Sequence, residues 1–295
     1  MSVDYRTVPL PDGRELEVLV EGDADGFPLV LHHGTPGSAV PFPRATEAAA
    51  KHGLAVVHYS RAGYGPSTPK PDRTIADVAA DIAAVLDSLG HREFVTLGWS
   101  GGGPHALACA ALLPDRCRAA ATLAGVAPYL NGDTLDFLAG MGPENVTEFG
   151  AALDGRESLE PYLRKEAASL TGATPDELAG ALGGLVSDVD KAYATGDFAA
   201  RLLASFEHGC GESVEGWAED DLAFTRDWGF ELSAIRVPVS VWQGAEDRMV
   251  PFSHGQWLAG HVPGARVHLY DDEGHLSLWS KADRIIDDLI ELARL

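Results

Sequence analysis

A serine in a glycine-rich stretch is the residue of this sequence best placed to do chemistry. Residues 98–102 read Gly-Trp-Ser-Gly-Gly, the pattern G-x-S-x-G, and stand between an apolar run and an alanine-rich one. A serine on a sharp strand-to-helix turn needs small residues two positions before and after it, because strand and helix crowd together there. Its hydroxyl would then lie at a helix amino end, where the dipole favours developing negative charge. The pattern predicts that Ser100 is a nucleophile.

A phosphate-binding loop and a chance occurrence of the pattern fit this stretch less well. A strand–glycine–helix junction can bind phosphate, but no Gly-Lys-Ser/Thr ending follows here, and the next apolar run, residues 119–127, carries no acid for a ribose. A short glycine-rich pattern can also arise by chance. Chance becomes improbable if the remaining parts of an acyl-transfer site are present.

Such a site needs a base for the serine and a carboxylate that orients the base. We predict His275 as the base, because it alone among 11 histidines follows the last predicted strand, ahead of the closing helix. We predict Asp247, which follows the preceding strand, as the acid. The acids at 271–273 are too close in sequence to His275 to orient its ring easily, and Glu246 is the fallback.

The site also needs donors for an oxyanion and a surface for the substrate. Backbone amides of Thr35, in the turn after the third predicted strand, and of Gly101, the residue after the nucleophile, are the predicted oxyanion donors. Trp99, Met249 and Leu276 adjoin these residues, so they are candidates for substrate binding, although each also fits a core position. The aromatic side chains of the middle of the chain are expected mostly to pack in a core; they are Phe137, Tyr162, Trp217, Phe224 and Trp228.

The elements that position these residues follow a strand–helix alternation. Short β-branched runs separated by amphipathic segments predict an α/β fold with a mainly parallel, eight-stranded sheet. The first two strands flank a turn signal at 11–14 and should pair as an antiparallel hairpin. Helices are predicted at about 74–90, 104–113 and 282–295. The predicted strands are 4–10, 15–21, 27–32, 54–60, 93–98, 119–125, 237–243 and 265–270.

Residues 128–236 break this alternation. They show no convincing strand, and their apolar residues recur at helical spacing. We predict a core of residues 1–127 and 237–295, with a helical cap at 128–236 inserted after the sixth strand. The cap would lie over the carboxyl ends of the strands, where open α/β sheets bind ligands.

The net charge of the chain argues against some classes of binding partner. The formal charge of −22 opposes binding to nucleic acid or anionic membranes, and residues 130–232 hold 21 acidic and 6 basic side chains. A solvated acidic surface is the simpler interpretation of that excess, and a field that attracts cationic substrates is the alternative. The first residues lack the features of a secretory signal and no run is long enough to span a membrane, so a cytoplasmic protein is expected.

The three cysteines give no sign of a metal site. Cys109, Cys117 and Cys210 show no CxxC spacing, and no histidine is placed to complete a ligand set. Buried free thiols are expected, and no metal or cofactor is predicted. The sequence does not indicate an oligomeric state.

Five short motifs stand at 33–37 (HGTPG), 60–67 (SRAGYGPS), 98–102 (GWSGG), 244–247 (GAED) and 274–275 (GH). In these motifs the chain resembles the α/β-hydrolase superfamily, in the branch with a helical cap. The order Ser100, Asp247, His275 is the one found there. Relatives that open epoxides or remove halides carry aspartate at the serine position, so Ser100 argues against both reactions.

One motif departs from the family pattern. The loop after the fourth strand usually reads Asp-x-Arg-Gly-x-Gly-x-Ser, and here Tyr59 replaces the acid and Ala62 the first glycine. That loop is structural in the family, so we expect Arg61 to brace a loop and to take no part in catalysis.

The resemblance implies a serine hydrolase that cleaves a carboxylic ester or related small acyl substrate through an acyl-enzyme, without a cofactor. One alternative is an aminopeptidase similar to proline iminopeptidases, in which cap acids hold a substrate ammonium; the typical Gly-x-Ser-Trp-Gly of those enzymes differs from residues 98–102 here. Carbon–carbon bond hydrolases, lactonases and cofactor-free haloperoxidases use the same triad. A receptor-like member with slow turnover is the non-enzymatic alternative.

Overall fold

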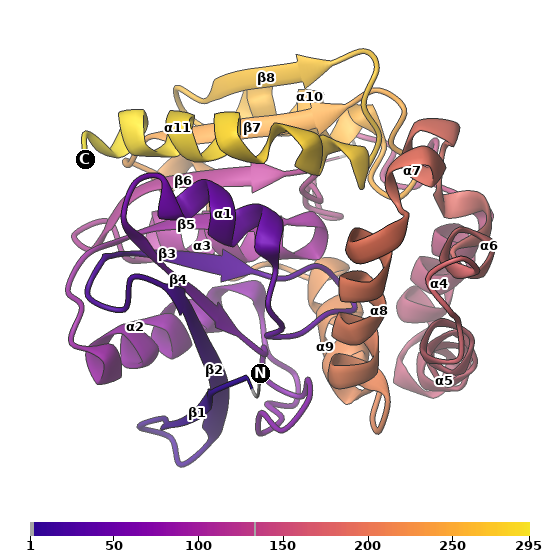
Figure 1. The fold of residues 1–295 in the computed structure, drawn as a ribbon. Coiled ribbons are helices and arrows are strands. Elements are labelled where there is room, and N and C mark those ends of the chain that lie inside the picture. Colours follow the sequence, from indigo (N-terminus) through magenta and orange to yellow (C-terminus); the bar gives the residue numbers. More distant parts are fainter. Residues whose placement is uncertain (1–2, 133) are drawn as a thin grey trace.

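The computed structural model describes residues 3–132 and 134–295, and its centre is one eight-stranded sheet (Figure 1). The strand order is β1-β2-β4-β3-β5-β6-β7-β8. Strand β2 pairs antiparallel with both β1 and β4, and every other neighbouring pair is parallel. The predicted mainly parallel sheet and its amino-terminal hairpin are thus confirmed. The strands are β1 (Tyr5–Pro9), β2 (Glu15–Gly22), β3 (Phe27–His32), β4 (Leu54–Tyr59), β5 (Phe94–Trp99), β6 (Cys117–Leu123), β7 (Val239–Gly244) and β8 (Arg266–Tyr270).

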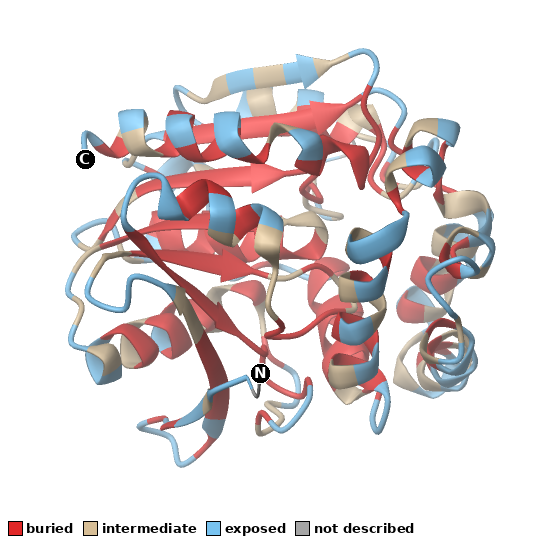
Figure 2. Ribbon diagram, viewed as in Figure 1, coloured by how far each residue is buried: buried red, intermediate tan, exposed pale blue. Residues whose placement is uncertain are grey.

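Helices cover both faces of the sheet, so its inner strands are buried on both sides (Figure 2). Successive strand residues point to opposite faces, and Val30 and Leu31 accordingly belong to different hydrophobic clusters. Helices α1 (Pro43–Ala50) and α11 (Ala282–Ala293) pack on the face that holds Leu31. The other face is covered by α2 (Val78–Leu89), α3 (Gly103–Leu112) and α10 (Phe252–His261).

A helical segment joins β6 to β7 and lies beyond the carboxyl ends of the parallel strands (Figure 1). Many of its apolar residues form a further cluster that includes Leu276 of the core, and others, such as Phe149 and Phe224, pack with the core cluster that holds Val30. Within its described residues no strand occurs. The domain boundaries at 128 and 236 stay a prediction. The helices are α4 (Pro143–Asp154), α5 (Arg156–Thr171), α6 (Leu178–Ala181), α7 (Asp188–Tyr193), α8 (Gly196–Cys210) and α9 (Glu215–Phe224).

Several acids of this segment are buried, so the expectation of a solvated acidic surface is wrong for them. Each of the five is at most 9% exposed: Glu148, Asp190, Glu219, Asp220 and Asp221. Burying a carboxylate is costly unless it is paired or hydrogen-bonded. These side chains must therefore have partners in the fold, or a raised pKa.

The structure also shows the state of the three cysteines and the length of the helices. Cys109, Cys117 and Cys210 are all buried and unpaired, as expected. In the ranges that the structure describes, no helix combines the length and the apolar character needed to cross a membrane.

Candidate active site

Ser100 lies on the turn between β5 and α3, in a conformation that non-glycine residues rarely adopt. Its φ is +55°, in the left-handed region. The glycines on either side allow the turn, because a Cβ atom on Gly98 would collide with the Gly102 carbonyl, and one on Gly102 would collide with the carbonyl of His32. The structure therefore shows the strained strand-to-helix turn that the glycine spacing predicts.

His275 and Asp247 are brought together from the loops after β8 and β7. The Nδ1 atom of His275 lies 2.8 Å from Oδ2 of Asp247, and both residues are buried. The other Asp247 oxygen accepts hydrogen bonds from the backbone amides of Met249 and Val250, at 2.9 and 2.8 Å. The fallback acid Glu246 is exposed. Asp247 is thus the carboxylate that fixes the ring of His275.

The two groups perturb one another's ionisation. Burial opposes the charged form of His275, but the carboxylates of Asp247 and, to a smaller extent, Asp190 together outweigh it, so the pKa of the imidazole is raised above its ordinary value of 6.5. Burial raises the pKa of Asp247, and its contacts with His275 and with the Val250 amide oppose that rise. The Asp247 carboxylate therefore favours the protonated form of the imidazole.

The loop that carries Thr35 lies against the Ser100 turn. A Cβ atom on Gly101 would collide with the Thr35 side chain, so the two residues pack directly together. Arg61 braces this loop, as expected: its guanidinium donates to the carbonyls of His33 and Gly34, the latter at 2.8 Å. The assignment of the Thr35 and Gly101 amides as oxyanion donors stays a prediction.

Asp220 of α9 binds Arg61 and so connects the Thr35 loop to the helical segment. It is 0% exposed and accepts hydrogen bonds from Arg61 Nη2 at 2.6 Å and Thr35 Oγ1 at 2.7 Å. Arg73 Nη2 and the Tyr64 hydroxyl donate to it as well, at 2.6 and 2.7 Å. Burial alone would raise the pKa of Asp220, but the two guanidinium groups hold it well below its ordinary range. A buried ionic cluster thus connects α9 to the Thr35 loop.

A pocket with a volume of about 100 Å³ opens above Ser100. Its lining includes every predicted site residue except Asp247, which lies behind His275: Ser100, His275, Thr35, Gly101, Trp99, Met249 and Leu276. The expectation that the cap aromatics serve mostly as core holds for four of the five, since Phe137, Phe224 and Trp228 belong to one buried cluster and Trp217 to another. Trp217 and Phe224 also line the pocket, as does Tyr162.

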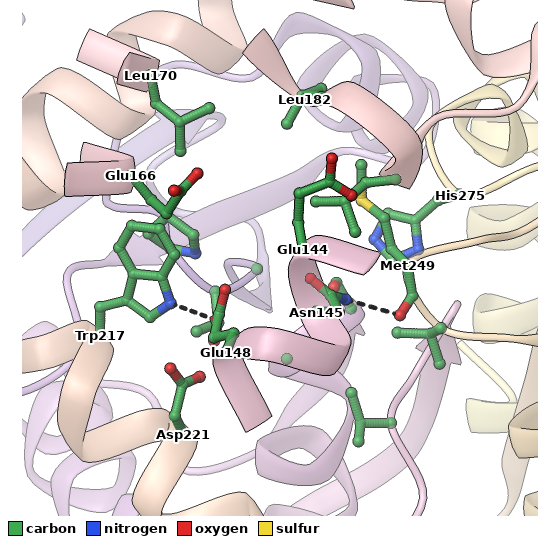
Figure 3. A pocket seen from close by; sticks show the side chains of 18 of the residues that line it. Glu144, Asn145, Glu148, Glu166, Leu170, Leu182, Trp217, Asp221, Met249 and His275 are labelled. Atoms are coloured by element: carbon green, nitrogen blue, oxygen red, sulfur yellow. Dashed lines mark hydrogen bonds between the residues drawn. The ribbon is translucent and has the colours of Figure 1, made fainter. Parts of the chain in front are cut away.

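Four acids also line this pocket: Glu144, Glu148, Glu166 and Asp221. Figure 3 shows Glu148, Glu166 and Asp221 grouped around Trp217, whose indole N–H donates to Glu148 at 2.8 Å. Burial raises the pKa of Glu148 to about 7, and burial together with the nearby Glu148 charge raises the pKa of Asp221 well above its ordinary value. One carboxyl oxygen of Asp221 has no hydrogen-bond partner among the described residues.

Sequence reasoning did not single out the four acids of the pocket lining, and it missed Asp190 and Asp220, which bind the loops beside the pocket. Both lie in an acid-rich segment that was expected to be solvated, and their partners are far away in the sequence. For Asp220 a signal exists, because residues 219–221 are three acids inside the apolar run from Trp217 to Phe224. A helix that is apolar around an acidic triplet indicates buried carboxylates with partners. No comparable signal marks Asp190.

Comparison with known proteins agrees with this architecture. Residues 28–282 match the family described as alpha/beta hydrolase fold. Because that match covers most of the chain, the protein belongs to this family, which is an enzyme family of hydrolases.

The relatives span several reactions. A non-heme chloroperoxidase from Streptomyces lividans is 31% identical over 294 residues, covering 98% of this chain and 99% of that protein. A 2-hydroxy-6-oxononadienedioate/2-hydroxy-6-oxononatrienedioate hydrolase from Burkholderia vietnamiensis is 28% identical over 296 residues, covering 96% and 93%. Among solved structures, the enol-lactonase from Burkholderia xenovorans LB400 has a TM-score of 0.69 at 21% identity, covering 99% and 100% of the two chains.

Proposed function

We propose that this protein is a serine hydrolase that cleaves carboxylic esters or related small acyl compounds through an acyl-enzyme. The observation that carries the proposal is the arrangement of Ser100 on a strained turn, in one pocket with a His275 whose other ring nitrogen is held by a buried Asp247. The small pocket favours a short acyl group or a small leaving group.

In the proposed reaction, Ser100 Oγ attacks the substrate carbonyl while His275 Nε2 takes its proton. The backbone amides of Thr35 and Gly101 hold the oxyanion, and Asp247 stabilises the imidazolium. His275 then protonates the leaving alcohol. Water, activated by the same imidazole, attacks the acyl-enzyme and restores Ser100.

The activity should depend on pH through His275. The base must be neutral to accept the serine proton, and its pKa is raised, so kcat/KM should fall as the pH drops through a midpoint above 6.5. Phenyl acetate is a suitable substrate because it does not ionise between about pH 5 and 9. A midpoint well below 6.5 would show that Asp247 does not support the imidazolium.

A panel of aryl esters of rising acyl length, assayed beside alanyl and prolyl anilides, tests the reaction class. We expect multiple turnovers on short esters and slower turnover on anilides. A single slow turnover accompanied by a large rise in Tm with the ligand would favour the receptor-like alternative. Faster turnover of the anilides than of the esters would place the aminopeptidase alternative first.

The acids of the pocket support one second candidate, an acyl substrate that carries a positive charge. Glu148 and Asp221 line the pocket together with the aromatic rings of Trp217 and Tyr162, and carboxylates combined with aromatic faces are what an ammonium group prefers. Burial raises the pKa of both acids, so it favours their neutral forms in the empty pocket. A bound cation would favour their ionised forms, because an opposite charge nearby lowers the pKa of a carboxyl group.

Two isosteric aryl esters test this candidate. The trimethylammonioacetyl ester and the 3,3-dimethylbutanoyl ester have the same shape and differ in charge. After correction for their rates with hydroxide, we expect a preference of about 10-fold for the cation. That preference should grow as the pH rises through about 7, where Glu148 ionises.

Variants assign the preference to the acid pair. Glu148→Gln combined with Asp221→Asn should remove the preference for the cation and leave hydrolysis of the neutral ester almost unchanged. Glu157→Gln, which removes a charge from an exposed position outside the pocket lining, is the matched control. Equal turnover of both esters by the unchanged protein would count against a cationic substrate.

A further inference from the structure

We infer that Asp190 is a positioning residue for the catalytic base, through which the helical segment between β6 and β7 holds the His275 loop in its working geometry. This inference rests on the proposed function of His275. It assigns a role to a buried carboxylate that lies outside the predicted triad.

Among the described residues, the side-chain hydrogen bonds of Asp190 go to the loop that carries the base. Its Oδ2 accepts the backbone N–H of His275 at 2.9 Å, and its Oδ1 accepts those of Leu276 and Ser277 at 2.8 and 2.9 Å. Asp190 is 0% exposed. Hydrogen bonds to a carboxylate are stronger than those between neutral groups, so one side chain fixes three successive amides.

The loop is shaped to receive this carboxylate. A Cβ atom on Gly274 would collide with the Asp190 carboxyl group, so the backbone approaches closely only because residue 274 is glycine. The Gly274 amide instead donates to Ser277 Oγ at 2.8 Å, which closes the loop on itself. Figure 1 places α7 beside the loop that follows β8. The base is therefore held from two sides: Asp247 binds its ring and Asp190 binds its backbone.

The negative charge of Asp190 also acts on the ionisation of the His275 imidazole. Two carboxylates, Asp247 and Asp190, favour the protonated ring and raise the pKa of His275 against the effect of burial. The neighbouring Glu273 is paired with Lys281 at 2.5 Å and with the Ser280 hydroxyl. On α7 itself, Asp188 is exposed and pairs with Lys191. Asp190 is thus the acid of α7 that acts on the base.

Asp190→Asn is the variant that tests the inference, because it keeps the size and removes the charge. The asparagine NH₂ group would face backbone N–H groups of residues 275–277 that now donate to the carboxylate, so the loop should shift. We expect kcat per active site to fall by about 10- to 100-fold, with a much smaller change in KM. The acid limb of kcat/KM should move to lower pH, because the imidazole loses a negative neighbour. Asp188→Asn makes the same change on the same helix at an exposed position, and it should alter neither kcat per active site nor the acid limb of kcat/KM.

Active sites are counted by labelling Ser100 with a fluorophosphonate, so that loss of folded protein is separated from loss of rate. An Asp190→Asn protein with unchanged kcat per labelled site and an unchanged acid limb would overturn the inference. Amide exchange in the unchanged protein supplies a second measurement that does not need a variant. The backbone amides of residues 275–277 should exchange as slowly as those of α7, and both sets should become exchangeable in the same opening event. Exchange of the two sets at independent rates would also overturn the inference.

The same assays keep this inference apart from the proposed function. If Ser100→Ala retains activity, the proposed function fails. If Ser100→Ala is inactive while Asp190→Asn behaves as the unchanged protein, only the role of Asp190 fails.

Discussion

Replacing Ser100 by alanine is expected to lower kcat/KM for short aryl esters by at least about 10⁴-fold. The hydroxyl is the only group that the proposed reaction joins covalently to the substrate. The residual rate would come from the oxyanion donors and from binding alone. The measurement is ester hydrolysis under steady-state conditions, corrected for the uncatalysed rate.

Ser100→Gly is the control for this result. The native φ of +55° is unfavourable for serine and acceptable for glycine. The glycine variant should therefore be as inactive as the alanine variant, yet have a Tm no lower than that of the unchanged protein. Activity lost without loss of stability excludes unfolding as the cause. Activity retained in either variant would show that the nucleophile lies elsewhere.

Replacing Asp220 by asparagine is expected to destabilise the protein by about 3–5 kcal/mol. The change leaves the guanidinium groups of Arg61 and Arg73, both buried, without their shared counter-charge. The asparagine keeps only one acceptor oxygen, so its NH₂ group also meets donors that Asp220 now accepts, such as the hydroxyls of Thr35 and Tyr64 or the Arg73 guanidinium. Urea unfolding measures the effect, and the activity of the folded fraction should fall because the predicted oxyanion loop is no longer braced.

Asp197→Asn provides the comparison for Asp220. Asp197 is an exposed acid of α8 that pairs with Arg201 at 3.5 Å, a surface pair worth at most about 1 kcal/mol. If Asp220→Asn were no more destabilising than Asp197→Asn, the buried cluster would not be what fastens α9 to the Thr35 loop.

The sheet was predictable because its signals are local. The apolar runs that become β3 to β7 are short, and the helical spacing of α2 stands between a plausible cap and Gly90. The Ser100 turn was predictable for the same reason, since its glycines lie within two residues of the serine. His275 and Asp247 could be chosen because the fold pattern fixes which strand each follows.

The contacts of the helical segment were not predictable in this way. Asp190 meets the His275 loop across 85 residues of sequence, and Asp220 meets Thr35 across 185. The sequence shows the acidic excess of 130–232 and the acidic triplet at 219–221 inside an apolar run, but not which partners these carboxylates meet. The same holds for Tyr162, Trp217 and Phe224, whose size suits a core and a pocket wall equally.

Trapping the acyl-enzyme is the most direct test of the proposed reaction. The protein is mixed with an aryl ester, quenched in acid within the first turnover, digested and examined by mass spectrometry. We predict one added acyl group, on the peptide that contains Ser100, and none in the Ser100→Ala protein. Continued ester turnover with the acyl group on another residue, or an unchanged yield of acyl-enzyme in the Ser100→Ala protein, would contradict the proposed reaction.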